Sequence, residues 1–319
     1  MPENRIGWID VVKGIGIILV VLGHDLRGLA TSRILSPAGA AETTDRWIYS
    51  FHMPLFFFLS GLFILQSLRR TSLVDFLGEK TRTIVYPYFI WSCLTILVKA
   101  PLGTIPNTPR TLADIPVTVV SPVEQYWFLY ALFLLFLLFS VALYLRVPLW
   151  IIACGSLAIS IFPIPTGWAI LNTAFSYAVF FGAGVALGAP SKSFTTLPPR
   201  YLLTACLIGA IIPLVFNVQP FAGFAGICFA IALAVLVPER FAFPLAFLGR
   251  YSLEIFLAHT MVSAASRILL LHAGVSSGSI HLIVGCVAGL AVPLALGVWI
   301  RDRFPYAFVL PLHPRWISS

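Results

Sequence analysis

Apolar residues in this chain fall into repeated runs of about 17–22, close to the roughly 20 that an α-helix needs to cross a bilayer core. Charged residues or Pro and Gly separate the runs. A transmembrane β-barrel would instead show short segments in which apolar and polar residues alternate. The runs therefore predict an all-α, polytopic transmembrane helical bundle.

We predict about ten spans from the hydropathy pattern. They lie near residues 8–24, 47–66, 84–99, 125–145, 148–164, 168–188, 201–217, 221–237, 252–271 and 280–300. The longest segments between them, about 25–46 and 100–123, are expected to be surface segments. No gap is long enough for a soluble domain, so we expect residues 1–319 to form a single integral membrane domain.

The distribution of basic residues among the loops indicates how the chain is oriented in the membrane. With the N-terminus inside, thirteen basic residues fall in the even loops and both tails, and five fall in the opposite loops. This asymmetry satisfies the positive-inside rule for ten spans with both termini cytoplasmic. The net charge of +8 thus reflects topology. Because the basic residues are spread over many short loops, nucleic acid is not an expected partner, whereas membrane lipid is.

Cysteines give no sign of a metal centre. The five cysteines lie in or beside apolar runs, without a CxxC pair or a metal-type Cys/His spacing. We interpret them as small core residues and expect no metal ion.

The first predicted span carries ionisable residues that a lipid-facing helix would avoid. Asp10, Lys13 and His24 share one stripe, because at 100° per residue Lys13 and Asp10 fall within about 20° and 40° of His24. Lys13 and His24 are separated by roughly 16 Å along the helix. Asp10 and Lys13 could instead snorkel at one interface while His24 caps the other. Three ionisable residues on one stripe favour a functional site.

Further polar residues interrupt later apolar helices. His52 lies in "FHMPLFFFLSGLF", Glu124 precedes "QYWFLYALF", and Glu254 and His259 lie in "LGRYSLEIFLAH". Each could be structural or mark the water boundary. We take these four residues as candidate substrate-binding residues.

A basic cluster follows the second predicted span. Arg69, Arg70, Lys80 and Arg82 lie on the predicted cytoplasmic side. Such clusters often reflect topology and anionic lipid. They could equally bind the phosphates of a nucleotide-like cofactor, since guanidinium groups suit phosphate geometry.

Five segments together resemble a known family. "WIDVVKGIGIILVVLGH", "FHMPLFFFLSGLF", "TRTIVYPYFIW", "YWFLYALF" and "LGRYSLEIFLAH" occur in an order similar to that of the acyltransferase type 3 family of membrane O-acyltransferases, in the branch similar to fucose 4-O-acetylases. The family's motif of a basic residue, ten spacers and a histidine falls on Lys13 and His24. Its Arg-rich juxtamembrane motif is matched only approximately, by Lys80 and Arg82, because a strict RxxR is absent.

The resemblance implies an enzyme of the inner cell membrane. It would transfer acetyl from cytoplasmic acetyl-CoA to a hydroxyl of a sugar, polysaccharide or glycan precursor. His24 would be the general base or a transient acyl acceptor. Lys13 would contact the donor, Asp10 would hold Lys13, and Lys80, Arg82, Arg69 and Arg70 would bind donor phosphates.

Two other classes of function compete with this interpretation. In a transporter or flippase, the polar stripe would line a path for a proton or substrate. A scaffold protein would leave the buried charges without a purpose. The acceptor, the side of the membrane on which transfer occurs and the oligomeric state stay open at this stage.

Overall fold

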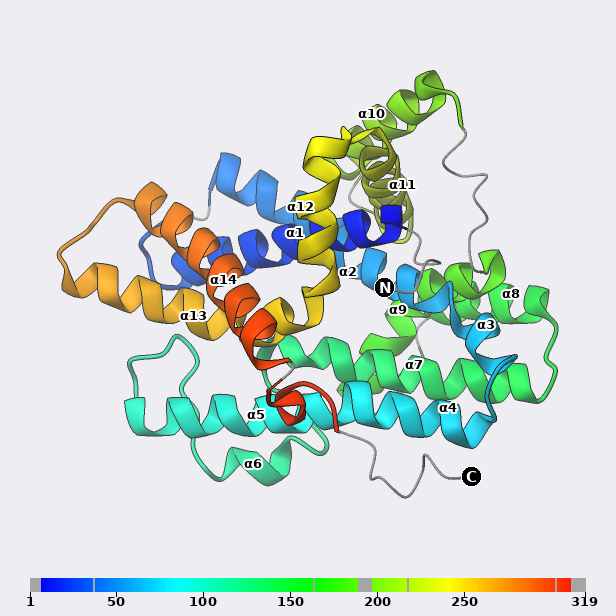
Figure 1. Ribbon diagram of the computed structural model, residues 1–319, viewed down its shortest axis with the longest axis horizontal. Helices are drawn as coiled ribbons and strands as arrows, with labels where there is room; N and C mark the ends of the chain where they lie inside the picture. The colour runs from blue at the N-terminus through cyan, green and yellow to red at the C-terminus, as the bar shows by residue number, and fades with distance from the viewer. Residues whose placement is uncertain are drawn as a thin grey trace. The chain divides into compact units, whose positions relative to one another are not determined.

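The computed structural model describes residues 7–36, 38–162, 164–188, 197–216, 218–301 and 303–310. Within these ranges every regular element is helical and no strand occurs, which confirms the predicted all-α class (Figure 1). The longer helices are α1 (Gly7–Thr31), α2 (Ala40–Gly61), α5 (Tyr86–Lys99), α7 (Trp127–Tyr144), α8 (Leu149–Ile161), α9 (Ala169–Leu187), α10 (Pro199–Val215), α11 (Phe221–Leu236), α12 (Glu239–Arg250), α13 (Ser252–His272) and α14 (Gly278–Ile300). The shorter ones are α3 (Ile64–Leu68), α4 (Leu73–Lys80), α6 (Asp114–Val117) and the 3-10 or π segments η1 (Thr81–Val85), η2 (Ala100–Leu102), η3 (Glu124–Tyr126) and η5 (Pro305–Ala307).

Each predicted apolar span overlaps a helix. Among the described residues, six helical stretches are long and apolar enough to cross a membrane, namely Ala40–Leu68, Leu73–Leu102, Glu124–Tyr144, Ala169–Leu187, Ser252–His272 and Gly278–Ile300. Helices α8, α10 and α11 are apolar but shorter. The chain is an integral membrane protein, while the number of crossings and the location of the termini stay predictions.

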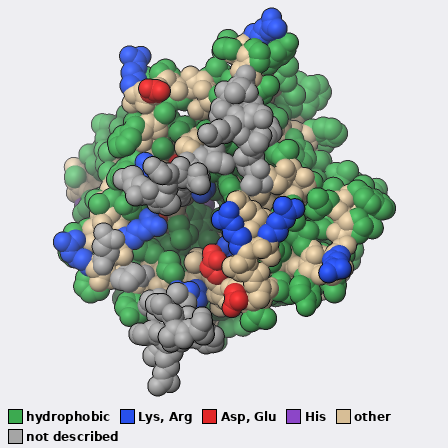
Figure 2. Space-filling model, turned by 45° about the vertical axis from the view of Figure 1, so that its right-hand side comes forward, with side chains coloured by type: hydrophobic (Ala, Val, Ile, Leu, Met, Phe, Trp, Pro, Cys, Tyr) green, Lys and Arg blue, Asp and Glu red, His purple; other side chains and the backbone are tan. Residues whose placement is uncertain are grey.

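Apolar side chains face outward, as a lipid environment requires. Figure 2 shows them over most of the visible face, with Lys and Arg scattered among them. On α10, Leu203, Leu207 and Ile211 recur at helical spacing and are each more than half exposed. This stripe is typical of a helix that faces lipid.

The segment 25–46, expected at the surface between the first two spans, is helical over much of its length. Helix α1 continues to Thr31 and α2 begins at Ala40. Leu26 and Leu29 are buried and extend the apolar face of α1 by two turns, so the helix does not stop at the polar residues His24 and Asp25. Helix α12 was not predicted, because its apolar run, residues 241–248, is far shorter than a membrane span.

The described chain forms two compact units. Unit 1 comprises residues 1–60 and 190–297, and unit 2 comprises residues 61–189 and 298–319.

Helix α1 is the central element of unit 1. It packs against α11, α12 and α13, and α12 crosses it in Figure 1. The closest approach is reciprocal: a Cβ on Gly14 would overlap the backbone of Leu245 on α12, and a Cβ on Gly249 of α12 would overlap the carbonyl of Asp10 on α1. Glycine at both positions allows the two backbones to touch, which is the usual means of tight helix packing in membranes.

In unit 2, α7 lies beside α4 and η1, and α9 packs on α7 and α8. The C-terminal segment 303–310 lies against α5 and η1. Tyr86 Oη donates to the carbonyl of Tyr306 (2.9 Å) and Trp91 Nε1 to that of Ala307 (2.8 Å). Pro87 lacks an N–H group, and the preceding N–H, that of Tyr86, bonds to the carbonyl of Thr81 in a π-helical turn.

We predict that Gly14→Ala destabilises the protein although alanine is the better helix former. The added Cβ meets backbone, which cannot rotate away, so the overpacking should cost about 2 kcal/mol and lower Tm by roughly 5 °C. Thermal unfolding of the detergent-purified protein measures this.

Gly155→Ala in α8 is the matched control, since a Cβ there has nothing within 4 Å. It should leave Tm unchanged or raise it slightly. Equal Tm values for Gly14→Ala and the wild type would contradict the packing described here.

Candidate active site

Three histidines from three helices of unit 1 lie in one cluster. The ring centroid of His24 on α1 is 5.1 Å from that of His259 on α13 and 6.2 Å from that of Tyr49 on α2. Tyr49 is in turn 4.6 Å from His52 on its own helix. His52 and His259 are buried and His24 is half-buried. The structure thus brings together three of the residues singled out from the sequence.

The backbone fixes the tautomer of two of these rings. His52 Nδ1 lies 2.8 Å from the carbonyl of Ile48, and His259 Nδ1 lies 2.8 Å from that of Phe256 and 3.0 Å from that of Ile255. Because a carbonyl can only accept, Nδ1 must carry the hydrogen in both rings. In the neutral rings, Nε2 is then a hydrogen-bond acceptor, and that of His259 is buried without a hydrogen-bond partner among the described residues.

Tyr49 connects the histidines to a charged pair at the end of α1. The guanidinium carbon of Arg27 lies 3.0 Å from the centroid of the Tyr49 ring. Arg27 also donates to both carboxylate oxygens of Asp45, at 2.8 and 3.0 Å. Gly23 makes room for this arrangement, because a Cβ there would lie 3.0 Å from the Tyr49 ring.

Asp10 and Lys13 lie near the other end of α1. Asp10 is buried, and its carbonyl packs on Gly249 of α12. Fourteen residues of helix separate Asp10 from His24, a rise of roughly 21 Å, so neither Asp10 nor Lys13 joins the histidine cluster. Their roles toward a donor stay predictions.

Glu254 lies one and a half turns before His259 on α13. It is buried, and its Cβ would be 3.0 Å from a Cβ placed on Gly297 of α14. Five residues of helix place it on a different face from His259. The structure therefore gives Glu254 a packing environment apart from the three histidines.

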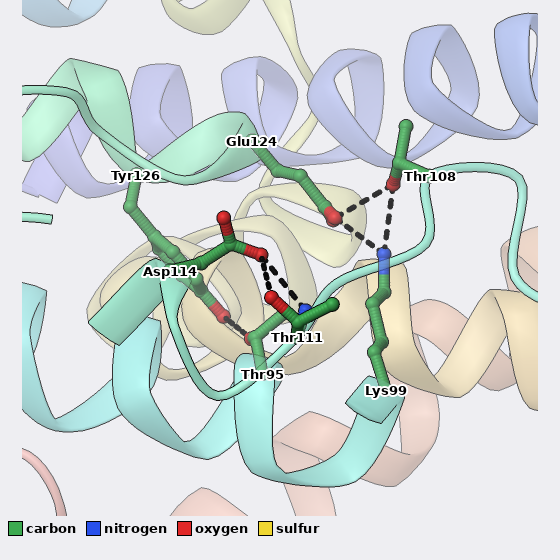
Figure 3. A network of polar contacts seen from close by, with 7 residues as sticks. All are labelled: Thr95, Lys99, Thr108, Thr111, Asp114, Glu124 and Tyr126. Atoms are coloured by element: carbon green, nitrogen blue, oxygen red, sulfur yellow. Dashed lines mark hydrogen bonds and ion pairs between the residues drawn. The ribbon is translucent and has the colours of Figure 1, made fainter. Parts of the chain in front are cut away.

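Glu124 belongs to a polar network in unit 2 (Figure 3). It forms an ion pair with Lys99 and accepts from Thr108 Oγ1 at 2.8 Å, while Lys99 Nζ donates to Thr108 at 3.0 Å. In the same region, the hydroxyl groups of Tyr126 and Thr95 form a hydrogen bond of 3.1 Å. The network ties the 103–123 segment to α5, so the Glu124 carboxylate already has two partners.

The four basic residues predicted to bind phosphate also lie in unit 2. Arg69 and Arg70 are exposed after α3. Lys80 lies 3.3 Å from Glu79 and 5.1 Å from the centroids of Phe76 and Phe136. Arg82 Nε donates to the carbonyl of Leu310 at 2.7 Å. The arginines at 69 and 70 are therefore the more available of the four to an external anion.

Tyr49 was not singled out from the sequence, and Arg27 was not paired with Asp45. Two spacings could have indicated them. Tyr49 precedes His52 by three residues and Arg27 follows His24 by three, so each pair shares a helix face. Arg27 was counted only as a loop charge because α1 was expected to end at residue 24.

An imidazole whose Nε2 lone pair is free can accept a proton from a substrate hydroxyl, and among the three histidines His24 is the one that is not fully buried. No group of three or more His, Cys, Asp or Glu side chains that could hold a metal ion occurs in the part of the chain that the structure describes.

Comparison with known proteins places this sequence in a family. A family model described as an acyltransferase domain matches residues 6–298, which include parts of both units. Nodulation protein NolL of Mesorhizobium japonicum is 32% identical over 164 residues, and NolL of Sinorhizobium fredii is 34% identical over 168 residues. Each alignment covers 51% of this chain and 43% of the relative, so the chain matches less than half the length of these proteins.

No solved structure matches the chain. The family match spans nearly the whole chain, as the five sequence segments implied, and includes all three clustered histidines. The chain therefore belongs to the acyltransferase type 3 family.

Proposed function

We propose that this protein is an O-acetyltransferase of the inner cell membrane that moves acetyl from acetyl-CoA to a hydroxyl of a sugar, polysaccharide or glycan precursor. The observation that carries the proposal is the cluster of His24, His52 and His259 within a chain of the acyltransferase family. A sugar hydroxyl is a poor nucleophile until a base removes its proton, and histidine changes protonation near neutral pH.

His24 is the general base in this proposal. His52 and His259 each use Nδ1 on a helix carbonyl and are buried, whereas His24 is half-buried. His24 takes the proton of the acceptor hydroxyl while the hydroxyl oxygen bonds to the thioester carbonyl carbon. The carbon–sulfur bond then breaks, and the CoA thiolate leaves with the proton from His24. The products are an O-acetyl ester and CoA thiol.

The neighbouring rings support such a base. The His259 ring stands edge-on to that of His24, with a 63° angle between their planes. The His259 and Tyr49 rings lie beside the His24 ring, and His52 lies beside Tyr49, so these side chains would limit the access of water to the base.

Donor binding is proposed to involve the basic residues. Arg69, Arg70, Lys80 and Arg82 would contact the phosphates of acetyl-CoA, since phosphate favours guanidinium partners. Lys13 would contact the donor as it enters, and Asp10 would hold the Lys13 side chain.

We predict that His24→Ala lowers acetyl transfer at least about 100-fold, because the hydroxyl loses its base. The assay follows labelled acetyl-CoA to glycan in membranes, and thermal unfolding checks the fold. A transporter with no covalent chemistry would consume no thioester even as the wild type.

His272→Ala is the matched control, since His272 is on α13 but exposed, and it bonds through Nδ1 to the carbonyl of Ile268 (2.8 Å). Its activity should equal that of the wild type. A folded His24→Ala protein that transfers acetyl at the wild-type rate would contradict the assignment of His24 as the base.

For the donor, we predict that the double substitution Arg69→Gln and Arg70→Gln raises KM for acetyl-CoA by about 10-fold and leaves kcat within about 2-fold, since charged hydrogen bonds to phosphate support donor binding. Steady-state kinetics at fixed ionic strength measures this. Arg240→Gln on α12, another basic residue of the predicted cytoplasmic side, should change neither constant. An unchanged KM in the double variant would remove these arginines from the donor site.

A further inference from the structure

A recess of about 100 Å³ opens beside the histidine cluster, where α1 ends and α2 begins. Its polar lining consists of Arg27, Ser36, Glu42 and Asp45, and the remaining lining is formed by four apolar residues of the same two helices and the loop between them. All of it belongs to unit 1. The recess combines an apolar wall with a few polar groups, as small-ligand sites do.

A continuous chain of contacts leads from the recess to the base. Arg27 lies in the lining and stacks on Tyr49, and the Tyr49 ring is 6.2 Å from that of His24. Arg27 itself follows His24 by less than one helical turn, a rise of roughly 4.5 Å. A ligand seated on Arg27 and Asp45 would therefore hold a neighbouring group close to the imidazole.

The charges of the recess select against the donor. Arg27 is paired with Asp45 through two hydrogen bonds, and Glu42 adds a second carboxylate. One guanidinium and two carboxylates give the lining a formal charge of −1, which disfavours the phosphates of CoA. Carboxylate oxygens and a fixed guanidinium instead suit the adjacent donors and acceptors of neutral hydroxyl groups.

The position of the recess in the membrane also favours the acceptor over acetyl-CoA as its ligand. The recess lies at the C-terminal end of α1, and the positive-inside count predicts a cytoplasmic N-terminus. The recess then faces away from the side that supplies acetyl-CoA. A recess of about 100 Å³ also suits a single sugar unit better than a nucleotide.

We propose that this recess binds the acceptor as a neutral sugar unit, with Arg27, Asp45 and Glu42 hydrogen-bonded to its hydroxyls so that one further hydroxyl meets His24. This inference rests on the proposed acetyltransferase function and assigns its acceptor subsite.

The test uses the cell's own glycans as the acceptor. A strain lacking the protein is complemented with the wild type, Asp45→Asn, Glu42→Gln or Arg46→Gln, and glycan O-acetyl content is followed over time by mass spectrometry. Binding of labelled acetyl-CoA to each purified protein is measured in parallel. Glu42→Gln keeps the Arg27–Asp45 pair intact and so tests the recess with least risk to the fold.

We expect the acetylation rate to fall about 10-fold or more for Asp45→Asn and about 3-fold or more for Glu42→Gln, since each variant weakens a charged hydrogen bond to the acceptor. Acetyl-CoA binding should be unchanged in both. Arg46→Gln, exposed and next to Asp45 but outside the recess, should behave as the wild type.

Wild-type rates in both recess variants would overturn the inference, and so would a loss of acetyl-CoA binding in Glu42→Gln. Failure of the proposed function looks different: the wild type itself would restore no acetyl groups to the glycans.

Discussion

Backbone contact between α1 and α12 is the constraint on which unit 1 depends. Gly14 and Gly249 each lie against a carbonyl of the other helix, so neither position can carry a side chain. Lipid supplies no hydrophobic force between helices, and close packing of small residues replaces it. The contact holds α1, with its charged and polar residues, inside the unit instead of against lipid.

Close packing against glycine also positions the side chains around the candidate base. Gly16 and Gly23 of α1 lie close to the Phe56 and Tyr49 rings of α2, because a Cβ added at either glycine would come within 3.0 Å of the nearest ring atom. Tyr49 can then reach both His24 and Arg27. Glycines on one helix thus decide which aromatic and ionisable groups of its neighbours surround the candidate base.

Much of the fold could be predicted from the sequence because membrane helices leave a strong local signal. Every apolar run overlaps a helix, and His24, His52 and His259 stood out as polar residues in apolar surroundings. The end of α1 could not be predicted by hydropathy, since Asp25 and Arg27 look like loop residues until Asp45 and Tyr49 are known to lie beside Arg27. Such contacts join distant parts of the chain and leave no periodic pattern.

Glu124 is a residue whose structural partners the sequence did not reveal. In sequence it is a lone carboxylate before an aromatic run, a position compatible with substrate binding. In the structure it is engaged by Lys99, 25 residues earlier, and by Thr108. Sequence spacing could not reveal this partner, because a Pro- and Thr-rich segment separates the two residues.

The role of the histidine cluster is tested most directly by an experimental structure with a non-hydrolysable acetyl-CoA analogue bound. We predict that the acyl carbonyl carbon lies within about 4 Å of the His24 ring, in reach of a hydroxyl that this base could deprotonate. An ordered analogue whose acyl group lies away from His24, His52 and His259 would contradict this role.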